Sequence, residues 1–570
     1  MDGTMVVESE SRNYAYWGDP ANGPQALEDF FTSTPRLLAV DIETVSLEDT
    51  SITGIGVAVS RMEAFYFPVD SIYFGGVIGL LWDPEIKKVF HNCLFDLPIL
   101  EKLGVDAGNI ADTITMAYLL GLPAKLEDLS HAVDIKTRDM GDVLKEHGVK
   151  ETTGLPYRVL AEKCVKDVLA TYRLYHELGK YIDSAYFARE MRLIPVLRKI
   201  SARGIKLDHE VVEHLHTKYS REVETYRLLS EGEGFNPASP QQVAYILAQR
   251  GNYLKVKRSG RGKWSMPVDE LVLEKLDDPI AALVVNYRKV AKLLSTYIVP
   301  YRSQDRAYTR LHNNTATGRL ASTKRNLQNI PKGEMRGMFL PDFGTFTDFD
   351  YSQQELRTLA YVSGDREMTF LFTHGTCVEC GYLQSNERKH CDRCAGRIKD
   401  LDMHQDNADF MGIDRRTAKN TTFSMLYGGS AQTIMETAGI RSLDRAKELR
   451  RMWFGRFQQA GDWIEATVEE GLRTRQAKTM QGRILWLPLQ GEESDEDVAR
   501  KCVNYPIQGS AAEITKEAML RCKDLDMVLQ VHDELLLDGY VPEEEIKRLG
   551  VEEVAPFRTP VDVKYMGRWM

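Results

Sequence analysis

The stretch DYSQQELR, residues 350–357, decides the fold of the C-terminal half of the chain. It overlaps TFTDFDY (345–351), which is typical of a strand, and continues into QELRTLAYV (354–362), which favours a helix. Asp350 is therefore expected at the end of a strand, where the chain turns into a helix.

The acidic stretch VHDE (531–534) supplies a second carboxylate for the same region. It lies within MVLQVHDELLLD (527–538), a pattern that predicts two strands joined by a tight turn containing Asp533. A strand end and a hairpin turn can bring two acids together from separate segments. The alternative is a salt-bridged acid pair at a sheet edge, with no role in chemistry.

The composition excludes several classes of protein. Of the 570 residues, 43% are hydrophobic and 27% charged, as in globular proteins. The 73 basic and 83 acidic residues leave a net charge of −10, which excludes a uniformly basic, histone-like protein but not an enzyme with a local basic track. The longest uncharged apolar run, 74–82, is too short for a membrane span, and a signal-peptide pattern is missing. Because eight cysteines are too few for a secreted disulfide scaffold, we expect a soluble, cytoplasmic protein without a membrane partner.

The order of apolar runs divides the chain into segments. Residues 1–30 are polar and stay unassigned, whereas strands followed by helices predict an α/β domain over 31–185. Residues 186–310 are mostly helical in pattern. Between those helices, the glycine-containing segment 252–265 is basic and lacks acids, so it is expected either to contact phosphates or to lie solvated on the surface. Its basic residues are Lys255, Lys257, Arg258, Arg261 and Lys263.

Four acids in the N-terminal half form another candidate site. Asp41 and Glu43 follow the apolar run RLLAV two residues apart, so both side chains project from one face of a strand. Asp96 comes just after the apolar run KKVF, and Asp167 lies on a helix predicted to begin near Glu162.

The segments around these acids carry a family resemblance. DIETVSL (41–47), HNCLFDLPIL (91–100) and KDVLATYRLY (166–175) resemble the three exonuclease motifs of the proofreading domain of family A DNA polymerases. The resemblance implies an RNase H-like α/β domain whose four acids hold two divalent ions. Oxygen ligands of this kind suit Mg²⁺ or Mn²⁺. One ion makes hydroxide available and the other stabilises the leaving 3′ oxygen.

One position departs from the family pattern. Four residues before Asp167, where the family usually has a tyrosine that helps orient the attacking water, this chain has Lys163. An amine does not reproduce the hydrogen bonding of a phenol at neutral pH, although Tyr157 or Tyr172 could supply one from elsewhere. Metal binding is therefore predicted, while both an active exonuclease and a purely structural domain stay open.

The stretches 350–357 and 531–534 resemble the two metal-binding palm motifs of the same family. The resemblance implies that Asp350 and Asp533 hold two Mg²⁺ ions, which activate the primer 3′-hydroxyl and neutralise the triphosphate. It places Glu355 where a carboxylate excludes a ribose 2′-hydroxyl, with Tyr351 in the same wall. Deoxynucleotides are therefore the expected substrates.

A helix predicted around 414–428 carries Arg415, Lys419, Phe423 and Tyr427 at intervals of four, so that they form one slowly turning stripe. Its sequence RRTAKNTTFSMLYGG resembles the fingers helix of the family. By that resemblance Arg415 and Lys419 bind the triphosphate, Phe423 stacks on the incoming nucleotide, and Tyr427 guards the template position. Phenylalanine at 423 further implies discrimination against dideoxynucleotides. The alternative for the two aromatic residues is core packing.

Two other stretches match DNA contacts of the family. TATGRLASTKRNLQNIP (315–331) resembles the primer-template motif, with Arg319 in the minor groove at the primer end. RKCVNYPIQGSAAE (500–513) resembles the segment before the second palm motif. Further contacts with primer or template are implied for Arg500, Asn504, Gln508 and His532.

Two cysteine pairs lie in an insert over 374–397 that the family resemblance does not explain. Cys377 and Cys380 form one CxxC pair and Cys391 and Cys394 the other, ten residues apart, which is the spacing of a Cys₄ knuckle. Four thiolates in tetrahedral geometry favour Zn²⁺, and less strongly iron. Disulfides and unpaired thiols are the weaker alternatives. The insert is expected to clip the fingers or to contact DNA or a partner.

The resemblance runs from about residue 30 to the C-terminus and implies an α/β exonuclease domain followed by a right-hand polymerase of mixed α+β structure. The implied boundaries are 31–185 for the exonuclease and 186–570 for the polymerase, with the thumb at about 190–310, the palm at about 311–370 and 500–570, and the fingers at about 371–499.

We therefore expect a template-directed DNA polymerase with a 3′-5′ exonuclease, acting in replication or repair on primer-template DNA and deoxynucleoside triphosphates, with replication accessory proteins as further partners. Two rivals stay open: a nuclease whose polymerase half only holds DNA, and a polymerase whose exonuclease domain is inactive. The extent resembles the large fragment of bacterial DNA polymerase I, without room for a 5′ nuclease domain. That compactness is typical of bacteriophage enzymes and predicts the cytoplasm of a bacterial host.

Overall fold

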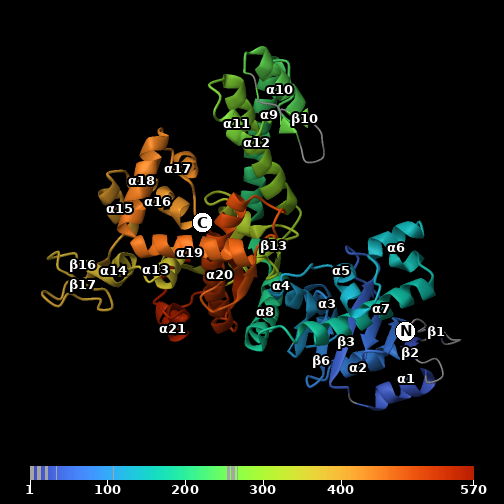
Figure 1. Cartoon of the computed structure of the whole chain (residues 1–570). Helices are drawn as coiled ribbons and strands as arrows, with labels where there is room; N and C mark the ends of the chain where they lie inside the picture. The colour runs from blue at the N-terminus through green and yellow to red at the C-terminus, as the bar shows by residue number, and fades with distance from the viewer. Residues whose placement is uncertain are drawn as a thin grey trace.

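The computed structural model consists of an N-terminal α/β half and a larger C-terminal half, joined through helix α8 (Ser184–Arg203) (Figure 1). It describes residues 5–8, 14–18, 23–33, 35–106, 108–252, 254, 257–258, 264–265 and 267–570. The side chains of the basic segment 252–265 that carried the phosphate-contact prediction lie outside the described residues.

A mixed sheet forms the centre of the N-terminal half. Its spatial order is β1-β2-β5-β4-β3-β6-β7, with β3, β6 and β7 parallel and the remaining neighbours antiparallel. The strands are β1 (Met5–Glu8), β2 (Ala15–Gly18), β3 (Leu37–Thr44), β4 (Ile52–Ala58), β5 (Ala64–Pro68), β6 (Lys87–Phe90) and β7 (Ile110–Asp112). Part of the unassigned stretch 1–30 thus extends this sheet through β1 and β2.

Helices cover both faces of that sheet. They are α1 (Gly23–Thr32), α2 (Phe74–Leu81), α3 (Cys93–Glu101), α4 (Thr113–Leu119), α5 (Leu126–Ser130), α6 (Met140–Glu146) and α7 (Tyr157–Leu178). Along β3, Leu38, Val40 and Ile42 point into the core formed with α1 to α3, because side chains alternate along a strand. The opposite face, which carries Asp41 and Glu43, is covered by α7. Helix α7 approaches β4 closely at Gly56, where a Cβ atom would lie 2.5 Å from Cys164 Sγ.

The segment predicted as the thumb is a group of helices at the top of Figure 1, in which α9 and α12 pack against each other. Its helices are α9 (His209–Gly232), α10 (Pro240–Gln249), α11 (Glu270–Leu273) and α12 (Pro279–Tyr297).

A four-stranded antiparallel sheet, ordered β21-β22-β15-β23, lies at the predicted palm. Its strands are β15 (Phe346–Tyr351), β21 (Met527–Val531), β22 (Glu534–Asp538) and β23 (Val561–Met566). Helices α20 (Asp495–Arg521) and α21 (Glu543–Arg548) pack against it, and α13 (Gln354–Ser363) packs against α20. The strand, turn and helix expected around 350–357 and 531–534 are confirmed.

The predicted fingers form the orange region of Figure 1, with the cysteine insert at its outer end. The helices are α14 (Arg366–Thr373), α15 (Met403–Met411), α16 (Arg415–Leu426), α17 (Ala431–Thr437), α18 (Leu443–Arg456) and α19 (Gln458–Thr474). The insert is a three-stranded sheet of β16 (His374–Cys377), β17 (Leu383–Ser385) and β18 (Ile398–Asp400).

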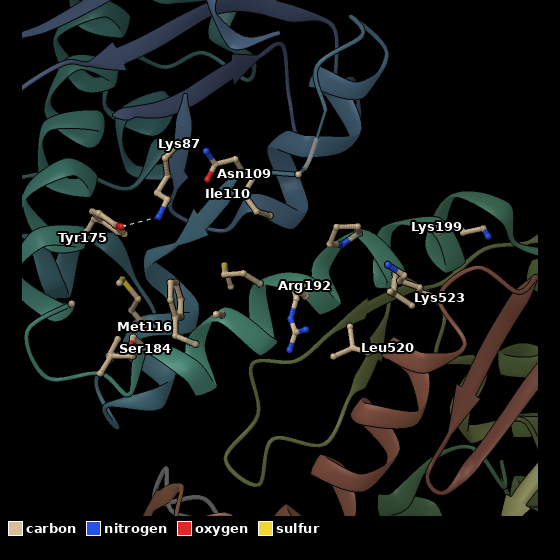
Figure 2. Close-up of a pocket in the computed structure, with 18 of the residues that line it drawn as sticks. Lys87, Asn109, Ile110, Met116, Tyr175, Ser184, Arg192, Lys199, Leu520 and Lys523 are labelled. Atoms are coloured by element: carbon tan, nitrogen blue, oxygen red, sulfur yellow. Dashed lines mark hydrogen bonds between the residues drawn. The ribbon is translucent and has the colours of Figure 1, made fainter. Parts of the chain in front are cut away.

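Hydrogen bonds join the two halves, such as Trp486 Nε1 donating to the carbonyl of Leu119 at 3.2 Å. At the same junction lies a cavity of about 940 Å³, bounded by the edge of the N-terminal sheet on one side and by α8 and the end of α20 on the other (Figure 2). None of the candidate catalytic acids lines it. Among the described residues, no helix combines the length and apolarity that a membrane crossing requires.

Candidate functional site

The four acids predicted in the N-terminal half come together between β3, α3 and α7. Asp41 and Glu43 share one face of β3, Asp96 lies on α3, and Asp167 lies on α7. The Oδ1 atom of Asp96 accepts a hydrogen bond from the Ile42 amide at 3.2 Å, which fixes it beside the strand. Burial, reinforced by Asp41, raises the pKa of Asp96 well above its usual range.

Lys163 lies inside this acid cluster, which the sequence did not predict. Its Nζ donates to Asp167 Oδ2 at 2.6 Å and to Glu43 Oε1 at 3.1 Å, and only 12% of the side chain is exposed. Burial alone would lower the pKa of Lys163, but Asp167 and Glu43 outweigh it and hold the pKa well above its usual value. Burial raises the pKa of Asp167 to about 7, although Lys163 opposes that shift.

The oxygen donors of this cluster fit a hard divalent cation. Asp41, Glu43 and Cys164 offer ligand atoms within 4.8 Å of one another, and Asp167 Oδ1 is buried without a hydrogen-bond partner in the described part of the chain. Carboxylate oxygens are the ligands that Mg²⁺ and Mn²⁺ prefer. Cys164 is buried, and its Sγ lies 3.7 Å from Asp41 Oδ2.

The second pair of acids meets at the end of the palm sheet. Asp350 is near the end of β15, and Asp533 lies in the two-residue turn between β21 and β22, where His532 adopts a φ of 57°. The Tyr351 amide donates to the carbonyl of Asp533 at 3.2 Å and thereby joins the strand end to the turn.

The electrostatics of this pair also suit a metal ion. Burial, together with Glu534, raises the pKa of Asp350, and burial with Asp350 raises the pKa of Asp533 to about 7. Asp350 Oδ1 is buried without a hydrogen-bond partner among the described residues. Two adjacent carboxylates with a free oxygen are a donor set that Mg²⁺ fits.

Beside Asp533 opens a cleft of about 330 Å³. Glu355 is its central acid, since it accepts hydrogen bonds from both the Arg319 guanidinium and the Tyr427 hydroxyl. Sequence reasoning assigned these three side chains to separate roles and did not foresee the network. His532 and Phe423 also line the cleft.

Helix α16 begins after Asp414, whose carboxylate accepts from the amides of Arg416 and Thr417 and so caps the helix. The predicted stripe runs from Arg415, paired with Asp402 at 2.8 Å, past Lys419, whose Nζ lies 5.9 Å from the centroid of the Phe423 ring.

His404, on α15, was missed by the sequence analysis, which had no motif pointing to it. Its buried ring packs 5.8 Å from that of Phe423 between centroids. Burial lowers the pKa of His404 to about 4, so the imidazole is neutral near pH 7.

The residues predicted on 500–513 lie four apart along α20. The same face of the helix continues from Gln508 to four residues that line the cleft, although Gln508 itself is not among the lining residues. The four are Ala511, Ala512, Thr515 and Lys516. Arg500 instead pairs with Asp497 at the helix start, and Asn504 keeps a buried Oδ1 without a partner in the described chain.

Tyr351 requires a correction. It was predicted to share the wall of Glu355, but its side chain is 2% exposed and its hydroxyl donates to the carbonyl of Val551 at 2.7 Å. Successive side chains of a strand point to opposite faces, so Tyr351 enters the core while Asp350 does not. Its contribution to the site is its backbone amide.

The four predicted cysteines converge at the tip of the insert. Sγ separations are 3.4 Å for Cys377–Cys394, 3.6 Å for Cys380–Cys391 and 3.4 Å for Cys380–Cys394. These exceed a disulfide bond and approach the separation of roughly 3.8 Å that follows from tetrahedral Zn–S bonds. Although burial opposes it, hydrogen bonds from the amides of Arg393 and Cys394 lower the pKa of Cys391 to about 7. The set fits zinc.

Comparison with known families finds two matches. The family described as DNA polymerase family A matches residues 206–557, and the family described as 3′-5′ exonuclease matches residues 22–183. Each contains one of the two acid sites.

Individual proteins are similar to most of the chain. DNA polymerase I of Chloroflexus aurantiacus is 30% identical over 574 residues, covering 89% of this chain and 57% of that protein. Thermostable DNA polymerase I of Thermus filiformis is 31% identical over 519 residues, covering 84% and 56%. The chain thus spans a little over half the length of these relatives. A solved polymerase domain of Pol1 from M. smegmatis, in complex with DNA primer-template and dNTP, superposes with a TM-score of 0.74 over 97% of this chain and 98% of that one, at 22% identity. That likeness confirms the predicted fold class.

Proposed function

Because the chain belongs to DNA polymerase family A, we propose that it is a template-directed DNA polymerase that adds deoxynucleotides to a primer 3′ end and carries a 3′-5′ proofreading exonuclease. Replication and repair of DNA are the processes that this pair of activities serves.

The meeting of Asp350 and Asp533 beside the cleft is the observation that carries the polymerase proposal. These two carboxylates would hold Mg²⁺, which when bound activates the primer 3′-hydroxyl and neutralises the triphosphate. In the described chain neither acid forms an ion pair, because the nearby Arg319 and Arg336 pair with Glu355 and Glu534. The carboxylate oxygens of Asp350 and Asp533 can therefore bind a metal ion.

The other side chains have proposed roles in binding. Arg415 and Lys419 would hold the triphosphate, and Phe423 would stack on the nucleotide. Glu355 would exclude a 2′-hydroxyl. Since Arg319 and Tyr427 both donate to Glu355, the groups assigned to the primer end, the sugar and the template position are linked before substrate enters. DNA contacts are further proposed for Arg500, Asn504, Gln508 and His532.

The exonuclease proposal is supported by the cluster of Asp41, Glu43, Asp96 and Asp167, which would hold divalent metal, Mg²⁺ or Mn²⁺. The alternative of an inactive, structural domain draws on Lys163, which bonds two of these acids. A nuclease whose polymerase half only holds DNA is less favoured, because both palm acids are present and adjacent.

A labelled-primer assay tests both activities. With a 5′-labelled primer on a longer template and Mg²⁺, we expect lengthening with deoxynucleotides and shortening without them. Asp350→Ala should abolish lengthening and spare shortening, whereas Asp41→Ala should do the reverse. Asp524→Asn, which changes an exposed acid outside both clusters, is the control. If either active-site variant lost both activities, the two-site assignment would be wrong.

The cysteine insert is proposed to hold one structural Zn²⁺. Metal analysis of the purified chain should find one zinc per molecule, and Cys380→Ser with Cys394→Ser should remove it. Unchanged zinc content in the double variant would contradict the assignment.

Primer-template DNA and deoxynucleoside triphosphates are the proposed partners, and accessory replication proteins are a further expectation. A cytoplasmic location, in a bacterial host if the source is a phage, is proposed because the reaction needs both DNA and deoxynucleotides.

A further inference from the structure

A lysine side chain of this chain, Lys163, lies among the acids of the proposed exonuclease site. Lys163 lies one helical turn before Asp167 on α7, with its Nζ 2.6 Å from Asp167 Oδ2 and 3.1 Å from Glu43 Oε1. The exposed fractions of the three side chains are 12% for Lys163, 6% for Glu43 and 9% for Asp167, so solvent screens their charges weakly. The ammonium therefore fills the space between two of the four acids expected to bind metal.

A divalent ion cannot share that space. Mg²⁺ binds oxygens at about 2.0–2.1 Å, so an ion between the same two carboxylates would lie within a few ångströms of the ammonium. Repulsion between two cations so close together is large in a partly desolvated site. The formal charges agree: four carboxylates and one ammonium give −3, one divalent ion leaves −1, and a second would reverse the sign to +1.

Asp41 and Asp96 are the two acids of the cluster that Lys163 does not bond. A ligand atom of Asp41 lies within 4.8 Å of ligand atoms of Glu43 and Cys164. Asp96 is fixed beside β3 by the Ile42 amide, close enough for the charge of Asp41 to raise its pKa. Among the described residues, Asp41 accepts only the weak contact from the Cys164 thiol, at 3.7 Å. Its carboxylate is thus not committed to Lys163.

We propose that Lys163 serves as one of the two cations of this site, and that the exonuclease domain binds a single divalent ion, at Asp41 and Asp96. This rests on the proposed exonuclease function and refines it. The ammonium can donate hydrogen bonds to phosphate oxygens near Asp167. The single ion at Asp41 and Asp96 would activate the water.

Metal counting tests the proposal. The full chain with Asp350→Asn and Asp533→Asn, which removes the palm ligands, is titrated with Mn²⁺ and bound ions are counted by electron paramagnetic resonance. We expect one ion that is lost on adding Asp41→Asn. Lys163→Met, which keeps the side-chain length without charge, should raise the count to two. Lys166→Met is the matched control, because Lys166 lies on the same helix but pairs with Glu162 at 2.5 Å, and the count should stay at one.

Two ions in the chain that retains Lys163, both lost with Asp41→Asn, would overturn the proposal, as would a count that Lys163→Met does not change. Circular dichroism with Mn²⁺ present verifies folding of each variant, and Lys163→Gln provides a second neutral replacement. Primer shortening is measured separately on the chain with intact exonuclease acids. One bound ion without shortening would refute the exonuclease function alone, and shortening with two bound ions would refute only the role of Lys163.

Discussion

The two acid sites differ in what balances their charge. In the exonuclease cluster Lys163 bonds Glu43 and Asp167, whereas within the described chain no lysine or arginine forms an ion pair with Asp350 or Asp533 in the palm. Arg319, whose charge acts on Asp533, forms its ion pair with Glu355.

This difference shows that similar sets of acids can be in different electrostatic states. A buried pair of like charges without an ion-paired lysine or arginine is unfavourable, so the divalent ion proposed for the palm would relieve repulsion between Asp350 and Asp533. The exonuclease cluster has already lost part of its repulsion to Lys163. The two sites should therefore respond differently when an acid is neutralised.

The largest expected effect is on extension. Asp533→Asn removes a proposed metal ligand. Because a bound metal supplies several kcal/mol, at about 1.4 kcal/mol per tenfold in rate, extension should slow by ~10³-fold. Single-turnover primer extension measures it. Shortening of the primer should continue at the unaltered rate. If the rate of extension fell by less than tenfold, Asp533 would not be one of the two catalytic acids.

Stability without metal should change in opposite directions at the two sites. In EDTA, Asp167→Asn should lower the free energy of unfolding by about 2 kcal/mol, because Lys163 loses one of two buried partners. Asp533→Asn should raise it by about 1 kcal/mol, since one of two like charges disappears. Urea unfolding of the two variants beside the unaltered chain measures both. If both variants changed the free energy of unfolding in the same direction, the two sites would not differ in how their charge is balanced.

A smaller effect is expected on sugar selection. Glu355→Gln keeps the shape of the side chain but weakens its bonds to Arg319 and Tyr427, so discrimination against ribonucleotides should fall by roughly tenfold. The ratio of incorporation rates for matched deoxy- and ribonucleotides gives the result. Selectivity equal to that of the unaltered chain would show that another group excludes the 2′-hydroxyl.

The smallest effect concerns pH. His404 has a folded-state pKa lowered to about 4, below its unfolded value near 6.5, so its contribution to stability is complete above pH 6.5 and is lost as pH falls toward 4. Asp533, whose pKa is raised, instead stabilises the folded chain as pH falls over much of the same range, and it does so in both proteins compared. Because His404→Gln removes the imidazole, the variant should lose less stability than the unaltered chain between pH 6.5 and 4 in EDTA. Identical pH profiles would mean that His404 can be protonated in the folded chain as easily as in the unfolded chain, which would contradict the lowered pKa.

Much of the fold could be predicted because its signals are local. Alternation along β3 placed Asp41 and Glu43 on one face, and the spacing of four along α16 placed Lys419 and Phe423 on one stripe. The CxxC spacing likewise predicted a four-cysteine cluster, and the family resemblance predicted the two-part architecture.

The rest depended on contacts between distant segments. Alternation along a strand also puts Tyr351 opposite Asp350, yet which face meets the cleft is decided by the packing of Tyr351 against the region of Val551. Likewise, nothing in the periodicity of α15 indicates that His404 will lie against Phe423.

By itself, the sequence determined which acids, cysteines and aromatic residues share a strand face, helix stripe or turn, because those relations repeat every two to four residues along the backbone. Only the tertiary structure decided which charges face one another: Lys163 reaches Glu43 across 120 residues of chain, and Arg319 reaches Glu355 across 36. The electrostatic state of a site depends on burial and on neighbours brought in by packing. Similar acids are therefore partly balanced by Lys163 in one half of the molecule, whereas among the described residues the palm pair has no ion-paired lysine or arginine.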